Sequence, residues 1–163
     1  MPVRPRTRIF HRNLNRRQFA GRFGIFAVPA GLGFSISTAN SSEFIEQPDL
    51  PDDIAFLERA FEMRQLAIEK GDQQYGAVVV RENKIIGQSW SKVVIDNDPT
   101  AHAEMAAIRD AARRTGSRNL DRAILYSSSR PCPMCEAAAY WANIKEMIHG
   151  RTGQKAGTPS LCG

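Results

Sequence analysis

Two short stretches decide how this 163-residue chain is interpreted: His102-Ala103-Glu104, and Pro131-Cys132-Pro133-Met134-Cys135 some thirty residues later. Each is expected at the start of a helix, one over Thr100 to Arg114 and one from Cys132 to about Asn143. A Cys-x-x-Cys pair on a first helical turn can direct both sulfurs at one ion, and a histidine nitrogen completes a set of three ligands. Zinc in proteins is tetrahedral, so a fourth position stays open for water, as in a catalytic site.

The electrostatics of such a site follow from the helix ends. Two helix N-termini that converge would favour the thiolate forms of Cys132 and Cys135, because their positive ends stabilise negative charge. Zinc lowers the pKa of a bound water from about 15.7 to about 7. Glu104 is two residues from His102, so its side chain diverges from the ligand. We therefore predict that Glu104 carries protons beside the ion and does not bind it.

The rest of the chain predicts helices that alternate with strands. The expected order is a helix from Asp52 or Asp53 to about Lys70, strands at 77–80 and 84–90 around a turn at 82–83, the helix at 100–114, a strand at 122–127, the helix at 132–143 and a strand at 145–149. Helices alternating with strands are typical of a layered α/β domain with a mixed sheet.

Positive charge is unevenly distributed along the sequence. Residues 1–39 contain seven arginines and no Lys, Asp or Glu. The remaining residues hold 15 basic against 17 acidic side chains, a formal charge of −2. No basic patch on the folded body is therefore expected, which disfavours a nucleic-acid partner.

The first segment resembles a twin-arginine export signal. Arg16 and Arg17 precede an uncharged stretch over 23–42, and its apolar centre is followed by the small residues Ser37-Thr38-Ala39. An uncleaved anchor or a misassigned start codon are the alternatives. We predict a signal peptide at 1–39, a linker at 40–51 and a domain at 52–163. The expected location is the periplasm, with membrane contact only during export, or the cytoplasm if the N-terminus is misannotated.

Residues 52–150 resemble the zinc-dependent cytidine and deoxycytidylate deaminase superfamily, whose signature is His-x-Glu with Pro-Cys-x-x-Cys. The run from Asn97 to Glu104 is especially similar to the branch of guanine deaminases and tRNA adenosine deaminases, and Ala139-Tyr140-Trp141-Ala142 is most similar to the guanine deaminases. The resemblance implies a three-layer α/β/α fold, a homodimer, and hydrolysis of an exocyclic amine on a small nucleobase or nucleoside, guanine-like first. It also implies the roles of the site residues: one zinc held by His102, Cys132 and Cys135, protons shuttled by Glu104, and a ring pocket lined by the backbone of Ala103 and Cys132.

Three features depart from the family pattern. Ser91 stands eleven residues before the histidine, where branch members usually carry an asparagine that hydrogen-bonds the base; a substrate contact from Ser91 would be shorter in reach. Arg130 stands where a glutamate is common. Only thirteen residues follow Gly150, so the usual C-terminal strand and helix are expected to be missing.

Three alternatives to a deaminase of small nucleobases or nucleosides remain open. A redox pair would leave His102 and Glu104 unexplained. A catalytically impaired, zinc-binding fragment could act as a binding or assembly module. A tRNA adenosine deaminase fits the run up to Glu104, but the charge of −2 outside the first segment disfavours it, because RNA binding relies on contacts from Lys and Arg to phosphates.

Overall fold

The structure, a computed structural model, describes residues 44–161. Its elements, in chain order, are α1 (Asp53–Glu69), β1 (Gly76–Arg81), β2 (Lys84–Trp90), α2 (Ala103–Thr115), β3 (Ile124–Ser127), α3 (Pro133–Trp141), β4 (Glu146–His149) and β5 (Gln154–Gly157). The expected α/β alternation is confirmed as far as β4.

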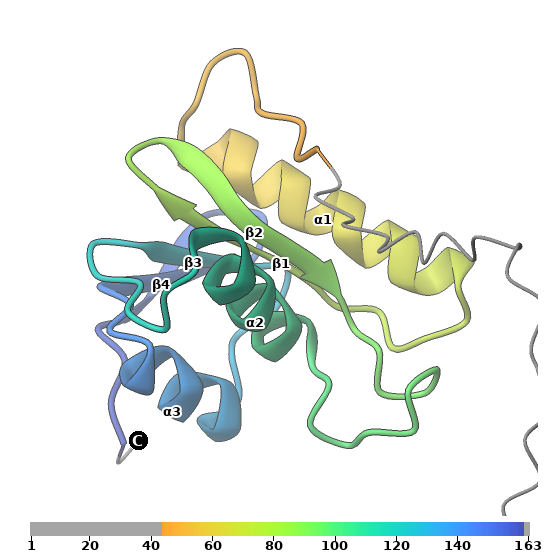
Figure 1. Ribbon diagram of the computed structural model, residues 1–163. Helices are drawn as coiled ribbons and strands as arrows, with labels where there is room; N and C mark the ends of the chain where they lie inside the picture. Colours follow the sequence, from red (N-terminus) through yellow and green to blue (C-terminus); the bar gives the residue numbers. More distant parts are fainter. Residues whose placement is uncertain (1–43, 162–163) are drawn as a thin grey trace, which may run out of the picture. The chain divides into compact units, whose positions relative to one another are not determined.

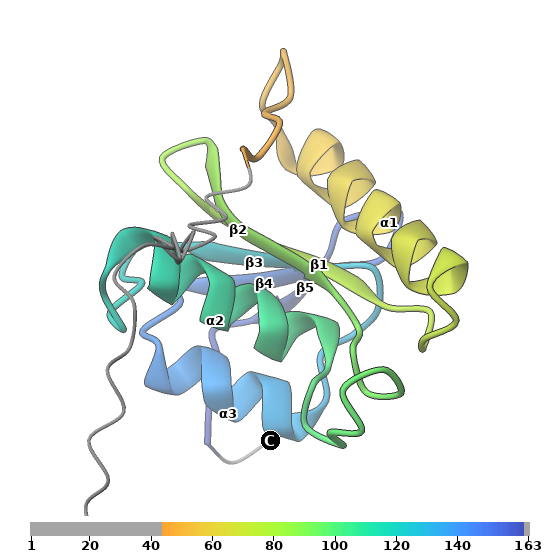
Figure 2. The same cartoon turned by 45° about the vertical axis from the view of Figure 1, so that its right-hand side comes forward.

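The strands form one mixed sheet in the order β2-β1-β3-β4-β5. The pair β3–β4 is parallel, and the other three neighbouring pairs are antiparallel. Helix α1 covers one face of the sheet, while α2 and α3 lie on the other (Figures 1 and 2). The chain thus has the three-layer α/β/α arrangement that its resemblance implied.

Alternation along the central strands supplies a separate core to each face of the sheet. On β1, Val79 belongs to the cluster packed against α2 and α3, whereas Val78 and Val80 belong to the cluster under α1. All three side chains are buried. Since successive side chains of a strand point to opposite faces, this single strand serves both layers.

Local signals place most boundaries correctly. The Asp52 side chain caps α1 by accepting from Ala55 N at 2.7 Å. Glu82 and Asn83 have φ of 54° and 57°, which matches the predicted tight hairpin turn. The predicted strand at 84–90 coincides with β2.

Helix α2 begins three residues later than predicted. The Asp98 carboxylate accepts from both the backbone N and the hydroxyl of Thr100, at 2.8 and 2.7 Å, and Ala101 N donates to the Asp98 carbonyl. These bonds close a turn before the helix, because an Asp side chain competes with helical bonding for nearby N–H groups. His102 is therefore the N-cap of α2.

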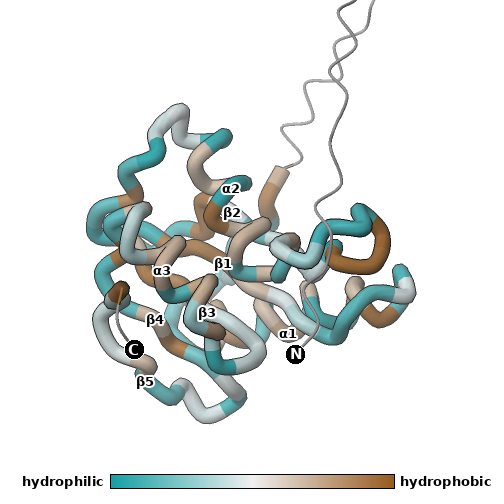
Figure 3. The backbone as a smooth tube through the Cα atoms, turned by 90° about the horizontal axis from the view of Figure 1, so that it is seen from below, coloured by the Kyte–Doolittle hydropathy of each residue, from teal (hydrophilic) through white to brown (hydrophobic). Residues whose placement is uncertain are grey.

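A fifth strand was not predicted. Strand β5 pairs antiparallel with β4 after a turn in which Gly150 and Gly153 have positive φ. Its sequence Gln-Lys-Ala-Gly is hydrophilic (teal near its label in Figure 3), so it has no apolar alternation that could reveal it. Residues 44–161 contain no helix after β4.

Several expectations concern residues that the structure does not describe. The predicted signal peptide at 1–39 and the start of the predicted linker at 40–51 lie outside residues 44–161. Within that range, no helix has both the length and the apolar character needed to cross a bilayer.

Candidate metal centre

Helices α2 and α3 bring the two signature stretches together at one end of the sheet, where β3 ends at Ser127. Both helices start on the same side of the molecule (Figure 2), and their N-caps are His102 and Cys132. Neither N-cap side chain caps its own helix with a hydrogen bond. The imidazole and the thiol instead face each other, at the point where two positive helix ends favour negative charge.

Three donor atoms form a nearly equilateral triangle. His102 Nδ1 lies 3.6 Å from Cys132 Sγ and 3.7 Å from Cys135 Sγ, and the two sulfurs are 3.6 Å apart. Tetrahedral zinc, with bonds of about 2.3 Å to sulfur and 2.0–2.1 Å to nitrogen, would separate such donors by about 3.5–3.8 Å. A disulfide would need sulfurs about 2.05 Å apart. The donor set therefore fits one tetrahedral ion with a fourth position available.

Glu104 lies beside this triangle on the first turn of α2. It is only 4 % exposed, and its Oε1 accepts a hydrogen bond from the Ser127 hydroxyl at 3.0 Å. Its Oε2 accepts from the Cys135 thiol at 3.6 Å. Ser127 thus holds one carboxylate oxygen while the other lies against the cluster.

The charge balance of this cluster calls for a cation. Burial and the neighbouring Glu104 carboxylate raise the pKa of the Cys135 thiol far above its usual value. A thiolate next to a buried carboxylate is costly without a compensating charge, whereas a bound metal ion stabilises both. The residues thus fit a divalent, thiolate-binding ion such as zinc.

The two predicted substrate contacts are both buried. Ala103 is the first residue of α2 and is fully buried between His102 and Glu104. Ser91 is also fully buried, and its hydroxyl donates to Asp72 Oδ1 at 2.8 Å. The Ser91 hydroxyl is therefore engaged within the protein, and its contact with substrate stays a prediction.

Sequence reasoning missed Ser127 and Asp72. Ser127 was predicted only as the end of a strand, and it pairs in register with His149 at the end of the parallel strand β4. Burial and the charge of Arg130 lower the pKa of His149, which is a strand residue, as predicted. Asp72 follows Gly71 after α1, and no local pattern marks either residue as part of a site.

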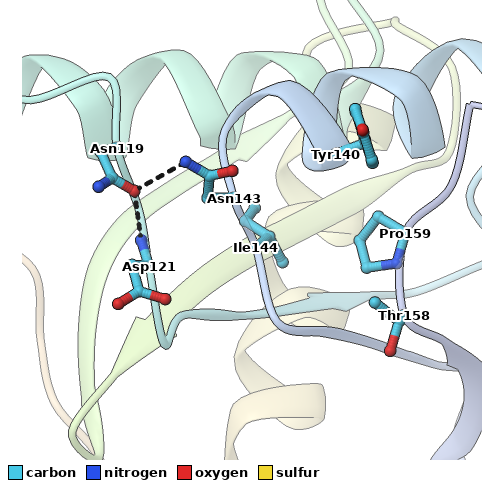
Figure 4. A pocket seen from close by; sticks show the side chains of 7 residues that line it. All are labelled: Asn119, Asp121, Tyr140, Asn143, Ile144, Thr158 and Pro159. Carbon is cyan, nitrogen blue, oxygen red and sulfur yellow. Dashed lines mark hydrogen bonds between the residues drawn. The ribbon is translucent and has the colours of Figure 1, made fainter.

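Two hollows lie near α3 and α1. One, of about 390 Å³, is at the C-terminal end of α3, and none of the candidate metal ligands lines it (Figure 4). The other is a groove lined by α1, the segment before β1 and the loop after β3: Phe61, Arg64, Gln73, Gln74, Tyr75, Ser128 and Ser129. Two of its lining residues, Ser128 and Ser129, directly follow Ser127, whose hydroxyl donates to Glu104.

Comparison with known families agrees with this geometry. The model of the cytidine and deoxycytidylate deaminase zinc-binding region matches residues 50–151, which include the whole donor cluster. The chain belongs to this family.

Relatives within the deaminase family carry different substrate names. The chain is 43% identical over 95 residues to guanine deaminase of Bacillus subtilis, covering 58% of this chain and 61% of the relative, and it is similar to a solved structure of that enzyme with a TM-score of 0.56. It is 38% identical to a tRNA-specific adenosine deaminase of Aquifex aeolicus, covering 63% of this chain and 68% of that protein. A probable cytosine deaminase of Schizosaccharomyces pombe is 34% identical, with 63% and 62% covered. The chain thus spans about three fifths of the length of the guanine deaminase.

Proposed function

We propose that this chain is a hydrolytic deaminase that replaces the exocyclic amine of a nucleobase or nucleoside by oxygen and releases ammonia, with guanine as the first candidate. The observation that carries the proposal is the triangle of His102 Nδ1, Cys132 Sγ and Cys135 Sγ, with edges of 3.6–3.7 Å that match tetrahedral zinc. The buried Glu104 carboxylate beside that triangle supplies the proton carrier.

The protein residues divide the chemistry among them. His102, Cys132 and Cys135 would hold one zinc ion, which when bound lowers the pKa of water at its open position. Glu104 takes the two protons of the attacking water one after the other at its carboxylate, and it delivers one to the ring nitrogen and the other to the leaving amine. Ser127 keeps the carboxylate oriented through its hydrogen bond to Oε1, so that proton transfer costs little reorganisation.

Guanine is the first substrate to test. The Bacillus subtilis relative has the highest identity of the relatives described here, and the segment Ala139 to Ala142 resembles guanine deaminases. Zinc-loaded protein should release ammonia from guanine faster than from cytosine, adenine or the corresponding nucleosides. If protein with one bound zinc releases no ammonia from any substrate of that panel, the proposal is wrong.

Glu104→Gln provides a matched control for the enzyme hypothesis. The amide is nearly isosteric but cannot act as the proton carrier, so we expect turnover to fall by about 10²–10⁴-fold while zinc content stays at one per chain. A catalytically impaired binding module predicts instead that wild type and Glu104→Gln are equally inactive.

Deamination of tRNA is a second candidate, supported by the Aquifex aeolicus relative and by two arginines in or near the groove. The guanidinium of Arg151 lies 4.2 Å from the centre of the Phe61 ring, and that of Arg64 lies 6.0 Å from it. Neither arginine forms a salt bridge within residues 44–161. The formal charge of −2 outside residues 1–39 did not predict that Arg64 and Arg151 lie on the same aromatic ring. Tight tRNA binding that weakens steeply with salt would favour this candidate over guanine.

Export and pairing complete the proposal. A twin-arginine route carries folded protein, so zinc could be loaded in the cytoplasm and would protect Cys132 and Cys135 from oxidation in the periplasm. Intact residues 1–39 on cytoplasmic protein would contradict this.

For pairing, Trp141 on α3 is 71% exposed and packs edge-on against Tyr140, which supports a homodimer. Light scattering would test it, with Trp141→Arg expected to give monomers.

A further inference from the structure

A buried carboxylate outside the metal centre has an unusually complete set of hydrogen bonds. Asp72 is 8% exposed and lies directly after α1, where its backbone N donates to the Ala67 carbonyl. Its Oδ1 accepts from the Ser91 hydroxyl at 2.8 Å and from Gln73 N at 2.7 Å. Its Oδ2 accepts two further hydrogen bonds. Each oxygen of this carboxylate therefore accepts two hydrogen bonds from groups of the protein.

The two further donors belong to the loop that leads into the metal centre. Val94 N and Ile95 N donate to Asp72 Oδ2 at 2.9 and 3.0 Å. The side chains of Val94 and Ile95 are 59% and 52% exposed, so apolar burial does not hold this part of the loop. Its position depends on the carboxylate that its backbone contacts.

The loop transmits that position to His102. Lys92 N donates to the Ala101 carbonyl at 2.9 Å, which closes the base of the loop one residue before His102. Asp98 N donates to the Val93 carbonyl at 3.2 Å and shapes the loop from within. A path of short contacts therefore runs from Asp72 through the loop to the imidazole that carries Nδ1.

From this path we infer that Asp72 is a positioning residue for the metal centre: it anchors the loop at residues 91–101 to the end of α1 and thereby sets where His102 meets the two cysteines. Ser91 is the partner that keeps the carboxylate in place. The inference rests on the proposed zinc site. It assigns Ser91 a role within the protein that differs from its predicted contact with substrate.

The test compares Asp72→Asn with Asp53→Asn in the full chain. Asp53 is the first residue of α1 and accepts a short hydrogen bond from the Tyr126 hydroxyl at 2.6 Å, on a different element from the loop at residues 91–101. Both substitutions replace a hydrogen-bonded carboxylate by an amide and are expected to lower the melting temperature. Only Asp72→Asn should alter the metal centre.

Three readouts separate positioning from general stability. Zinc affinity, measured by competition with a chelator, should fall about tenfold or more in Asp72→Asn and stay unchanged in Asp53→Asn. The visible spectrum of the Co²⁺-loaded protein, which reports ligand geometry, should change only in Asp72→Asn. Hydrogen exchange at the amides of Val94 and Ile95 should accelerate in the same variant.

Each outcome bears on the inference. If Asp72→Asn does not fold, Ser91→Ala removes one bond of the four and should lower zinc affinity by a few fold. Unchanged zinc affinity and an unchanged Co²⁺ spectrum in the folded Asp72 or Ser91 variant would overturn this inference and leave the proposed function standing. A wild-type chain that binds no zinc would overturn the proposed function and the inference with it.

Discussion

Gly87 on β2 offers a sharp test of how tightly α2 must pack for the metal centre to form. A Cβ at this position would lie 2.4 Å from Ala111 N, 2.6 Å from Ala111 Cβ and 2.7 Å from Ala111 Cα. Ordinary contact begins at 3.4 Å, so the helix would have to move by about 1 Å. Since α2 carries His102 and Glu104, Gly87→Ala perturbs both the core and the site.

Two opposing effects decide the size of the change. Replacing glycine by alanine reduces the entropy of the unfolded chain and by itself stabilises a protein by about 0.4–1 kcal/mol. Overpacking costs about 1–3 kcal/mol, and contacts to rigid backbone atoms favour the upper end of that range. We expect a net loss of about 2 kcal/mol in the free energy of unfolding, which corresponds to a melting temperature lower by roughly 8 °C.

Thermal unfolding and chelator competition measure the two consequences of Gly87→Ala. Zinc affinity should fall by about tenfold, because α2 moves with its N-terminal ligand. In the double variant with Ala111→Gly, the Cβ clash disappears but the clashes with the Ala111 N and Cα atoms remain, so less than half of the stability should return. An unchanged or raised melting temperature in Gly87→Ala would refute the close approach of β2 and α2, as would full rescue by Ala111→Gly.

Three further predictions concern single polar groups. Ser127→Ala removes the hydrogen bond to Glu104 and should lower kcat by about tenfold with full zinc content, measured by ammonia release and metal analysis; equal kcat would contradict the orienting role. Asp52→Ala removes the cap on Ala55 N and should cost about 1 kcal/mol in urea unfolding, while Asp52→Asn should cost much less. Burial alone would raise the pKa of Asp72, but its four hydrogen bonds together hold that pKa below the usual value. Its contribution is therefore present above about pH 4 and is lost as the pH falls through the lowered pKa, so the stability gap between wild type and Asp72→Asn should close on acidification.

The sequence predicted most of the fold correctly because the decisive signals are local. The cap at Asp52, the turn at Glu82-Asn83 and the run of β2 each depend on residues within a few positions of one another. The late start of α2 was missed because the turn made by Asp98 and Thr100 competes with a helical composition. Strand β5 was missed because its pairing with β4 compensates for a sequence without apolar alternation.

The sequence by itself determined the chemistry of the candidate site, since His-x-Glu and Cys-x-x-Cys name the donors and their spacing limits where each can lie. Only the tertiary structure decided what holds those groups in place. The bond from Ser127 to Glu104 joins residues 23 apart, and that from Ser91 to Asp72 joins residues 19 apart. A serine hydroxyl can bond to almost any polar neighbour, so its partner is fixed only when the sheet and helices bring one carboxylate within reach.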